Sequence, residues 1–414
     1  MQSEVWENLY KDSVQLTKPA QVKQLLSAEE MEAIQLLIKE VIDAFLEKGT
    51  VHVGLKTYVN KKLRNDMTGP MLANRPSSFH SIESWSKYIF GEEKFGMVLN
   101  SLEEYSNEFS EKAAMLVRPL LEHAGLPLGG LSFLFFMGNY GFTPFGVHKE
   151  APGEEGILFH LGPGKKQFYT WDDPIYNAMA HNKTVFHDFD SMLDHAMCYE
   201  LEPGDAMFIP HQVYHIANTT EFSLSFVMDY INPGSELFLN QLALDAGNVE
   251  VAHENNYLSP VKMDTRTAGW EQILDPSSLQ KKVDIAFRRK ILELKSNGGI
   301  LRKSKIISST RIPNGSFLIK SKSAFPIYLD EQSNNNILVF ARGHRISSKT
   351  HPKLPQLIGQ LNNGETIDIS YIRNILEPEW DMIDIFGLLG KLLQIEAIIA
   401  DYPETENQGS QMVS

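Results

Sequence analysis

The sequence predicts an α+β protein in which a β-sandwich or β-barrel is flanked by helical regions. Short apolar runs separated by Gly and Pro turns fill about residues 127–234, a pattern typical of sandwiches and barrels. Apolar residues at helical spacing precede them over about 18–125 and return over 235–296. The last part of the chain, about 300–403, mixes short strands with helices.

The composition is that of a globular protein. Of 414 residues, 43% are apolar and 22% are charged, close to the globular norm, and this length suggests two or three domains. The single cysteine, Cys198, excludes a disulfide scaffold and suits a reducing cytoplasm. We expect no targeting peptide at the N-terminus and no membrane span, since charged and polar residues interrupt the apolar stretch 385–400. The net charge of −14 makes nucleic acid an unlikely partner and suits a basic peptide or protein better.

The N-terminal region, 1–126, is predicted to be helical. One helix is expected over 21–47, with Ser27 and Glu30 forming a capping box, and a second over 98–123 that ends at Gly125. Residues 54–79 look irregular. The expected strands of the central region, 127–234, are 131–137, 157–161, 167–171, 206–209 and 222–230.

The remaining chain is expected to form a helical segment over 235–299, a mixed domain over 300–403 and a flexible tail over 404–414. The mixed domain resembles a winged-helix module, because two or three small strands stand beside three short helices. The strands are expected at 316–319, 324–329 and 336–346, and the helices at 355–361, 369–376 and 381–399.

The residues best suited to chemistry are His148, Glu150 and His215. His148 and Glu150 are two apart, so on a strand they point to the same side. Pro203-Gly204 favours a type II turn, after which an apolar strand would return His215 toward them. Two imidazoles and a carboxylate make a facial triad for Fe(II), with open positions for a co-substrate and dioxygen. A His-x-Glu pair alone is weak evidence in a chain with 13 histidines.

These motifs resemble those of the JmjC-type cupin oxygenases, particularly the ribosomal-oxygenase branch. That branch carries His-x-Asp, an apolar strand, a basic turn, and later Leu-x-Pro-Gly-Asp, an apolar strand, Pro and His. The matching segments here are His148-Lys149-Glu150, then 157–161, then Gly164-Lys165-Lys166, then 201–215. The resemblance implies a double-stranded β-helix, the cupin or JmjC jelly roll, with His148, Glu150 and His215 as the metal ligands.

The resemblance further implies 2-oxoglutarate as co-substrate, with Lys166 at its distal carboxylate. Lys165 and Lys166 would face opposite sides of the strand, so one of them points inward, and a solvated turn is the alternative for both. Leu134 and Phe136 stand where relatives often carry Asn or Tyr to hold 2-oxoglutarate. Asn139, Tyr140, Thr143 and Ser225, the last in a segment resembling the family's next strand, are the further candidates for the co-substrate site. His160, in an apolar strand, is expected to be a core residue.

The predicted function is therefore that of a cytoplasmic Fe(II)- and 2-oxoglutarate-dependent oxygenase. It would hydroxylate, or desaturate, a side chain of a peptide or protein, and the segment 235–299 resembles the family's dimerisation segment, which implies a homodimer. Two alternatives stay open. One is a cupin-like scaffold without oxygenase activity that binds partners through its C-terminal module, and the other is a metal cupin enzyme that does not use 2-oxoglutarate.

Overall fold

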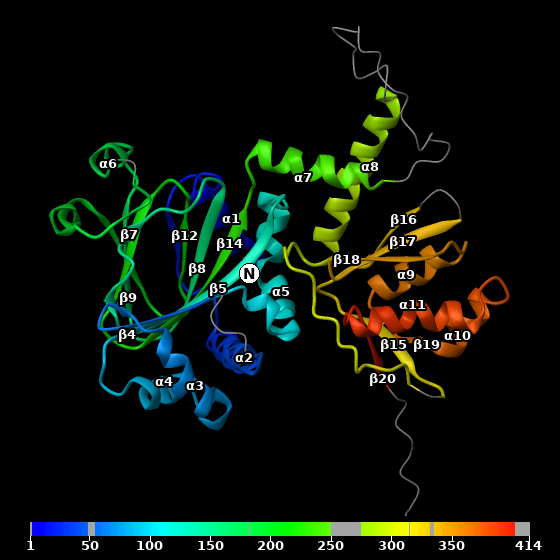
Figure 1. Ribbon diagram of the computed structural model, residues 1–414, viewed down its shortest axis with the longest axis horizontal. Coiled ribbons are helices and arrows are strands. Elements are labelled where there is room, and N and C mark those ends of the chain that lie inside the picture. Colours follow the sequence, from blue (N-terminus) through cyan, green and yellow to red (C-terminus); the bar gives the residue numbers. More distant parts are fainter. Residues whose placement is uncertain are drawn as a thin grey trace, which may run out of the picture. The chain divides into compact units, whose positions relative to one another are not determined.

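The chain forms two compact units in the computed structural model, which describes residues 2–48, 54–181, 183–249, 275–313, 315–331 and 335–401 (Figure 1). The first unit comprises Met1–Ser235 together with Gly299–Arg302, and the second comprises Glu236–Gly298 and Lys303–Ser414. No helix in the described part of the chain is long and apolar enough to cross a bilayer. The predicted tail, 404–414, lies outside the described residues.

Two antiparallel sheets make up the core of the first unit. The larger has the strand order β1-β12-β8-β14-β5-β4-β2-β3, and the smaller has the order β10-β7-β13-β9-β11, with β6 paired to β13. The strands of the larger sheet are Ala20–Val22 (β1), Leu55–Val59 (β2), Lys62–Leu63 (β3), Phe95–Asn100 (β4), Gly130–Gly138 (β5), Glu154–Pro163 (β8), Ala206–Ile209 (β12) and Ser223–Ile231 (β14). Those of the smaller sheet are Gly141–Phe142 (β6), Val147–His148 (β7), Lys166–Trp171 (β9), Val185–Phe186 (β10), Met197–Leu201 (β11) and Tyr214–Thr219 (β13).

The two sheets face each other across a shared apolar layer. Leu158 and Val227 of the larger sheet belong to one buried cluster with Phe168 and Ala217 of the smaller sheet. Successive strand residues point to opposite faces, so the same strands also present apolar side chains outward. The α+β class and the antiparallel sandwich predicted from the Gly/Pro-punctuated runs are confirmed, and each of the five predicted central strands is present.

Helices cover the outer face of the larger sheet. Trp6 of α1 (Gln2–Asp12) packs edge-on against Phe159 of β8, and Phe109 of α5 (Asn107–Ala124) packs edge-on against Phe133 and Phe226. The long helix α2 (Ala28–Glu47) contacts α5 and β8. The shorter helices of this unit are Asn65–Met67 (η1), Thr68–Ala73 (α3), Pro76–Ser78 (η2), Ile82–Phe90 (α4), Leu102–Glu104 (η3), Ile175–Met179 (α6) and Asp190–His195 (η4).

The region predicted as helical, 1–126, also supplies four strands. The capping box of Ser27 and Glu30 and the helix end at Gly125 are confirmed, but the first helix begins at Ala28 because 20–22 pairs with β12 instead. Residues 95–100 form the strand β4 and not the start of the second helix, because they pair with β5 on one side and β2 on the other. Part of 54–79, expected to be irregular, forms β2 and β3. Pairing with distant strands has overridden local helical spacing.

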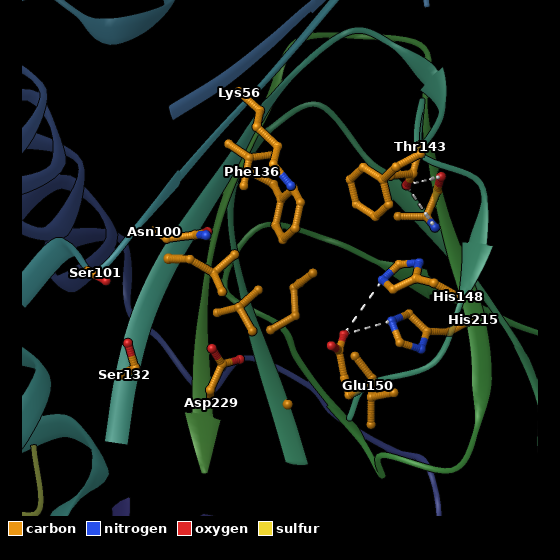
Figure 2. A pocket seen from close by; sticks show the side chains of 18 of the residues that line it. Lys56, Asn100, Ser101, Ser132, Phe136, Thr143, His148, Glu150, His215 and Asp229 are labelled. Atoms are coloured by element: carbon orange, nitrogen blue, oxygen red, sulfur yellow. Dashed lines mark hydrogen bonds and ion pairs between the residues drawn. The ribbon is translucent and has the colours of Figure 1, made fainter. Parts of the chain in front are cut away.

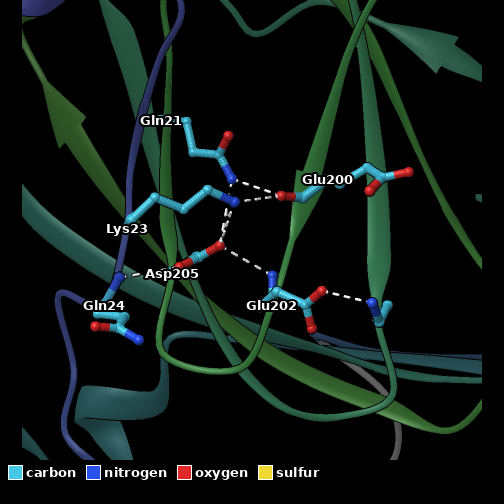
Figure 3. A network of polar contacts seen from close by, with 7 residues as sticks. Gln21, Lys23, Gln24, Glu200, Glu202 and Asp205 are labelled. Carbon is cyan, nitrogen blue, oxygen red and sulfur yellow. Dashed lines mark hydrogen bonds and ion pairs between the residues drawn. The ribbon is translucent and has the colours of Figure 1, made fainter.

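The Pro-Gly-Asp turn ahead of β12 has the predicted type II form. Gly204 has φ +95°, and the Asp205 amide donates to the Glu202 carbonyl at 3.0 Å. The buried Asp205 carboxylate accepts from the Gln24 and Glu202 amides, both at 2.9 Å, and from Lys23 Nζ at 2.9 Å (Figure 3). This carboxylate therefore closes the turn and ties the β1 segment to the barrel.

Where the structure describes it, the second unit contains two helices, two small sheets and a three-helix group. The first helices are α7 (Ser235–Gly247) and α8 (Pro276–Ser296); residues 250–274 of the predicted helical segment lie outside the described residues. The sheets have the orders β19-β15-β20 and β16-β17-β18. Their strands and the later helices are Leu318–Ser321 (β15), Tyr328–Glu331 (β16), Asn336–Ala341 (β17), His344–Lys349 (β18), Leu354–Asn362 (α9), Ile367–Asp368 (β19), Ile369–Leu376 (α10), Met382–Gln394 (α11) and Ile398–Asp401 (β20).

Three predicted elements of this unit are wrong in detail. The strand expected over 324–329 begins only at Tyr328, because the Phe325 amide closes a turn onto the Lys322 carbonyl at 3.0 Å. The strand expected over 336–346 is a hairpin, because Arg342 and Gly343 both have positive φ and reverse the chain. The helix expected over 381–399 ends at Gln394, and β20 follows because it pairs with β15. The predicted apolar stripe of that helix is buried: Ile385, Leu388, Leu389 and Leu392.

Candidate metal centre and adjoining cavity

Strand pairing brings the three predicted metal ligands together inside the first unit. His148 on β7 lies directly opposite His215 on the antiparallel strand β13, and their ring centroids are 4.2 Å apart. Glu150 follows β7 by two residues and points to the same side, as the His-x-Glu spacing predicts (Figure 2). Its Oε1 lies 3.6 Å from His148 Nε2 and 3.5 Å from His215 Nε2.

The backbone fixes which nitrogen of each histidine faces the centre. His148 Nδ1 lies 3.2 Å from the Gly146 carbonyl, and His215 Nδ1 lies 3.0 Å from the Val213 carbonyl. A carbonyl oxygen only accepts, so each Nδ1 carries the hydrogen and each Nε2 keeps its lone pair. Carbonyl partners of this kind orient metal-binding histidines. One potential ligand atom from each of the three residues lies within 4.8 Å of the others, which makes them the one such group in the described part of the chain.

The protonation states also suit a metal. Burial, helped by the neighbouring His215, lowers the pKa of His148 below its ordinary value, so its ring is neutral at pH 7. Burial by itself would raise the pKa of Glu150, but a histidine ring that carries a proton on Nε2 donates to this carboxylate and attracts it, which holds that pKa below its usual range. A neutral His148 and an ionised Glu150 are the ligand forms that a divalent cation requires.

A cavity of about 570 Å³ adjoins the triad between the two sheets. Its deep part is lined by Phe136, Tyr140, Thr143, Lys166 and Phe168. The opposite wall includes Asn100, Ser132 and Asp229 of the larger sheet and Ser101, which follows β4. Figure 2 shows Asp229 across the cavity from the triad. The cavity thus has an aromatic part that holds a lysine and a more polar part with an acidic residue.

The two lysines of the basic turn separate as predicted. Lys165 is exposed and pairs with Glu202 at 2.6 Å, whereas Lys166 is 1% exposed and lines the cavity. Burial lowers the pKa of Lys166 to about 7, and no described carboxylate forms an ion pair with it. Its Nζ lies 3.3 Å from the Tyr140 hydroxyl and 5.9 Å from the centre of that ring. A buried cation without an anion is costly, so this lysine is suited to an anionic ligand.

The other predicted co-substrate residues fall into two groups. Tyr140 and Thr143 line the cavity, and the Thr143 hydroxyl bonds to the Ala217 carbonyl at 3.0 Å. Asn139 and Ser225 are not among the lining residues. The Asn139 side chain accepts from the Phe95 amide at 2.9 Å, and the Ser225 hydroxyl lies 3.2 Å from His160 Nδ1.

Asp229 is a cavity residue that the sequence analysis missed. It lies on β14 between Ser132 of β5 and Gly156 of β8. Burial, reinforced by Glu150, Glu154 and Glu103, raises the pKa of its carboxyl well above the ordinary value. The sequence contained an indication of this position, because Asp229 is an acidic residue within an apolar strand. It lies two residues after Val227, so both side chains point to the same face of β14, and both line the cavity.

Comparisons with known proteins find similarity in structure and not in sequence. No family model and no curated protein matches the chain. The ribosomal oxygenase YcfD from Escherichia coli superposes with a TM-score of 0.50 at 13% identity, over 95% of this chain and 98% of that one. A second structure of YcfD, in complex with cobalt and 2-oxoglutarate, gives a TM-score of 0.48 at 13% identity with the same coverage. The carbocyclase SnoK from nogalamycin biosynthesis gives 0.35 at 12% identity, over 55% of this chain and 83% of that one.

The resemblance inferred from the sequence motifs is therefore confirmed at the level of the fold. The likeness to YcfD extends over nearly the whole of both chains. The His-x-Glu…His triad that carried the inference is assembled within one face of the barrel. The chain has the fold of the ribosomal oxygenase YcfD and holds a three-residue candidate metal site in it.

Proposed function

We propose that this protein is an Fe(II)- and 2-oxoglutarate-dependent oxygenase that hydroxylates a side chain of a peptide or protein. The observation that carries the proposal is the placement of the triad beside a cavity that contains the buried Lys166, which has no anionic partner among the described residues. The first feature fits a divalent metal and the second fits an anionic co-substrate. Neither feature serves the folding of an ordinary β-sandwich.

Fe(II) would be held by His148, Glu150 and His215, and when bound it supplies the dioxygen-activating chemistry of this enzyme class. The Gly146 and Val213 carbonyls keep the two imidazoles in the tautomer that presents Nε2. Glu150 stays ionised because the histidines hold its pKa low. A carboxylate ligand in this position favours hydroxylation or desaturation over halogenation.

The 2-oxoglutarate dianion would lie in the deep part of the cavity, with its distal carboxylate at Lys166. Protonated Lys166 would donate to that carboxylate, a charge-assisted hydrogen bond of about 1.5–3 kcal/mol. Tyr140, already bonded to Lys166, would hold the ammonium group in place. Phe136 and Phe168 would keep water away from this bond.

The substrate would approach along the polar wall that includes Asn100, Ser132 and Asp229. We further propose that 300–403 acts as a winged-helix-like accessory module, that 235–299 mediates homodimer formation, and that the protein works in the cytoplasm. The mixture of small antiparallel sheets and three helices in the second unit supports the first of these.

Oxygen-free titration tests the proposal without knowledge of the substrate. Fe(II) and then 2-oxoglutarate are added, and the visible charge-transfer band of a chelated keto acid is followed. We expect a saturable band in the wild-type protein and none in His215→Ala. Tight iron binding with no band would instead favour a cupin enzyme that does not use 2-oxoglutarate, and absence of iron binding would favour a scaffold.

A further inference from the structure

A second buried histidine, His160, lies outside the metal site and uses both of its ring nitrogens. It is fully buried on β8. Its Nε2 lies 2.7 Å from the Gly164 carbonyl, and its Nδ1 lies 3.2 Å from the Ser225 hydroxyl. The carbonyl only accepts, so Nε2 carries the hydrogen and Nδ1 accepts from Ser225. Both hydrogen bonds of a neutral imidazole are therefore satisfied in a single tautomer.

His160 is buried, as expected of a core residue, but burial alone does not explain why an imidazole stands here. Its neighbours in the strand are apolar, and an imidazole costs more to bury there than Leu or Val would. Burial, with a contribution from the charge of Lys166, lowers the pKa of His160 to about 3, so the ring stays neutral. A neutral ring can stand near Lys166 without adding a second buried positive charge.

The bond to Gly164 connects His160 to the co-substrate lysine. Gly164 opens the turn Gly164-Lys165-Lys166, and Lys166 is the first residue of β9. On its other side the turn is held by the Gly164 amide, which donates to the Phe222 carbonyl at 3.0 Å. A Cβ at position 164 would stand 2.7 Å from that carbonyl, so only glycine allows this approach.

We propose that His160 is a positioning residue for the co-substrate: its hydrogen bond to Gly164 fixes the turn that aims Lys166 into the cavity. The inference rests on the proposed function, since it concerns the lysine assigned to 2-oxoglutarate. His160 touches neither metal nor co-substrate. Removing it lets the turn shift, and Lys166 then meets the distal carboxylate less well. The metal triad, which is carried by β7, the two residues after it and β13, stays in place.

The test compares the affinity for 2-oxoglutarate with the affinity for Fe(II) in His160 variants, by oxygen-free titration of the charge-transfer band. In His160→Leu we expect the Kd for 2-oxoglutarate to rise about tenfold, the effect of one lost positioning hydrogen bond, with the Kd for Fe(II) unchanged within about twofold. His160→Gln keeps an N–H donor and a carbonyl acceptor and should restore binding to within about threefold of wild type.

Two further variants separate positioning from general stability. Phe159→Leu removes packing from the adjacent buried position on the outer face of β8, so it should lower the melting temperature without changing the Kd for 2-oxoglutarate. Ser225→Ala removes only the Nδ1 partner and should weaken 2-oxoglutarate binding less than His160→Leu does; it also provides the comparison if His160→Leu does not fold.

The outcomes distinguish this inference from the proposed function. An unchanged Kd for 2-oxoglutarate in folded His160→Leu, or equal weakening of Fe(II) and 2-oxoglutarate, refutes the positioning role while the wild-type band still supports the oxygenase. The same Kd in His160→Gln as in His160→Leu also refutes it. If the wild-type protein gives no band, the proposed function fails and the inference fails with it.

Discussion

Replacing Lys166 with methionine should stabilise the metal-free protein while greatly weakening co-substrate binding. The pKa of Lys166 is about 7 in the folded protein, against an ordinary value of 10.5. Each pH unit of that difference corresponds to about 1.4 kcal/mol, so at pH 7 the buried ammonium costs the folded state about 4 kcal/mol. Methionine fills a similar volume without charge.

One favourable contact opposes this gain. Lys166→Met removes the hydrogen bond to the Tyr140 hydroxyl and leaves that group without its recorded partner, which costs about 1 kcal/mol. The net expectation is a rise of about 3 kcal/mol in the free energy of unfolding at pH 7. A lysine with a depressed folded pKa destabilises most below that pKa, and the penalty disappears as pH rises toward the unfolded value. At pH 10 the penalty is under about 1 kcal/mol, so the difference between variant and wild type should fall to about zero.

The assay is urea denaturation of the metal-free proteins at pH 7 and pH 10, followed by tryptophan fluorescence, with 2-oxoglutarate titration of the iron-loaded proteins beside it. Lys166→Arg is the matched control, because it keeps the charge and should not stabilise. A variant that is less stable than wild type at pH 7, or a stability difference that does not change with pH, would contradict the cost assigned to the buried Lys166 ammonium. Normal 2-oxoglutarate affinity in Lys166→Met would contradict the assignment of Lys166 to the co-substrate.

Three other predictions follow from the same cavity. Binding of 2-oxoglutarate at pH 8 should take up nearly one proton, since Lys166 is mostly neutral at that pH in the empty site. Calorimetry in buffers of different ionisation enthalpy measures the proton uptake, and an uptake of zero would contradict the prediction. Asp229→Asn should raise the free energy of unfolding by about 1–3 kcal/mol at pH 8 and leave it unchanged near pH 4. A carboxyl whose pKa is raised by burial destabilises the folded state once the pH exceeds its unfolded pKa. Denaturation at both pH values measures this, and an equal stability difference between variant and wild type at pH 4 and pH 8 would oppose it. Tyr140→Phe should weaken 2-oxoglutarate binding about three- to tenfold and leave Fe(II) binding unchanged, by the same titration, whereas a loss of iron would place Tyr140 in the metal site.

The central strands could be predicted from the sequence because a strand that is buried on both faces is apolar along its whole length. Runs such as 131–137 and 206–209 are apolar, short and bounded by Gly or Pro, and the chain there has little alternative. The strands β1, β2 and β4 could not be predicted from a local apolar pattern of this kind. Their conformation depends on partners elsewhere in the chain, as when Ala20 pairs with Phe208, and the local pattern of 21–47 favours helix.

The candidate site likewise contains residues that could be predicted from the sequence and residues that could not. The spacing of His148 and Glu150 and the turn ahead of His215 could be interpreted because strand geometry fixes where such side chains point. Alternation along one strand predicted that only one of Lys165 and Lys166 points inward, but the choice of Lys166 came from the family resemblance and not from the spacing. Asp229 and His160 were not recognised as relevant, because their importance comes from what adjacent strands place around them and not from any spacing in the chain.

The most direct test of the central claim is the oxygen-free titration of the wild-type protein with Fe(II) and 2-oxoglutarate, with His215→Ala and Lys166→Met measured beside it. We expect a saturable charge-transfer band in the wild type, no band in His215→Ala for lack of metal, and iron binding with a greatly weakened band in Lys166→Met. A wild-type protein that binds iron but forms no band, or a band of equal affinity in Lys166→Met, would contradict the assignment of this cavity to 2-oxoglutarate.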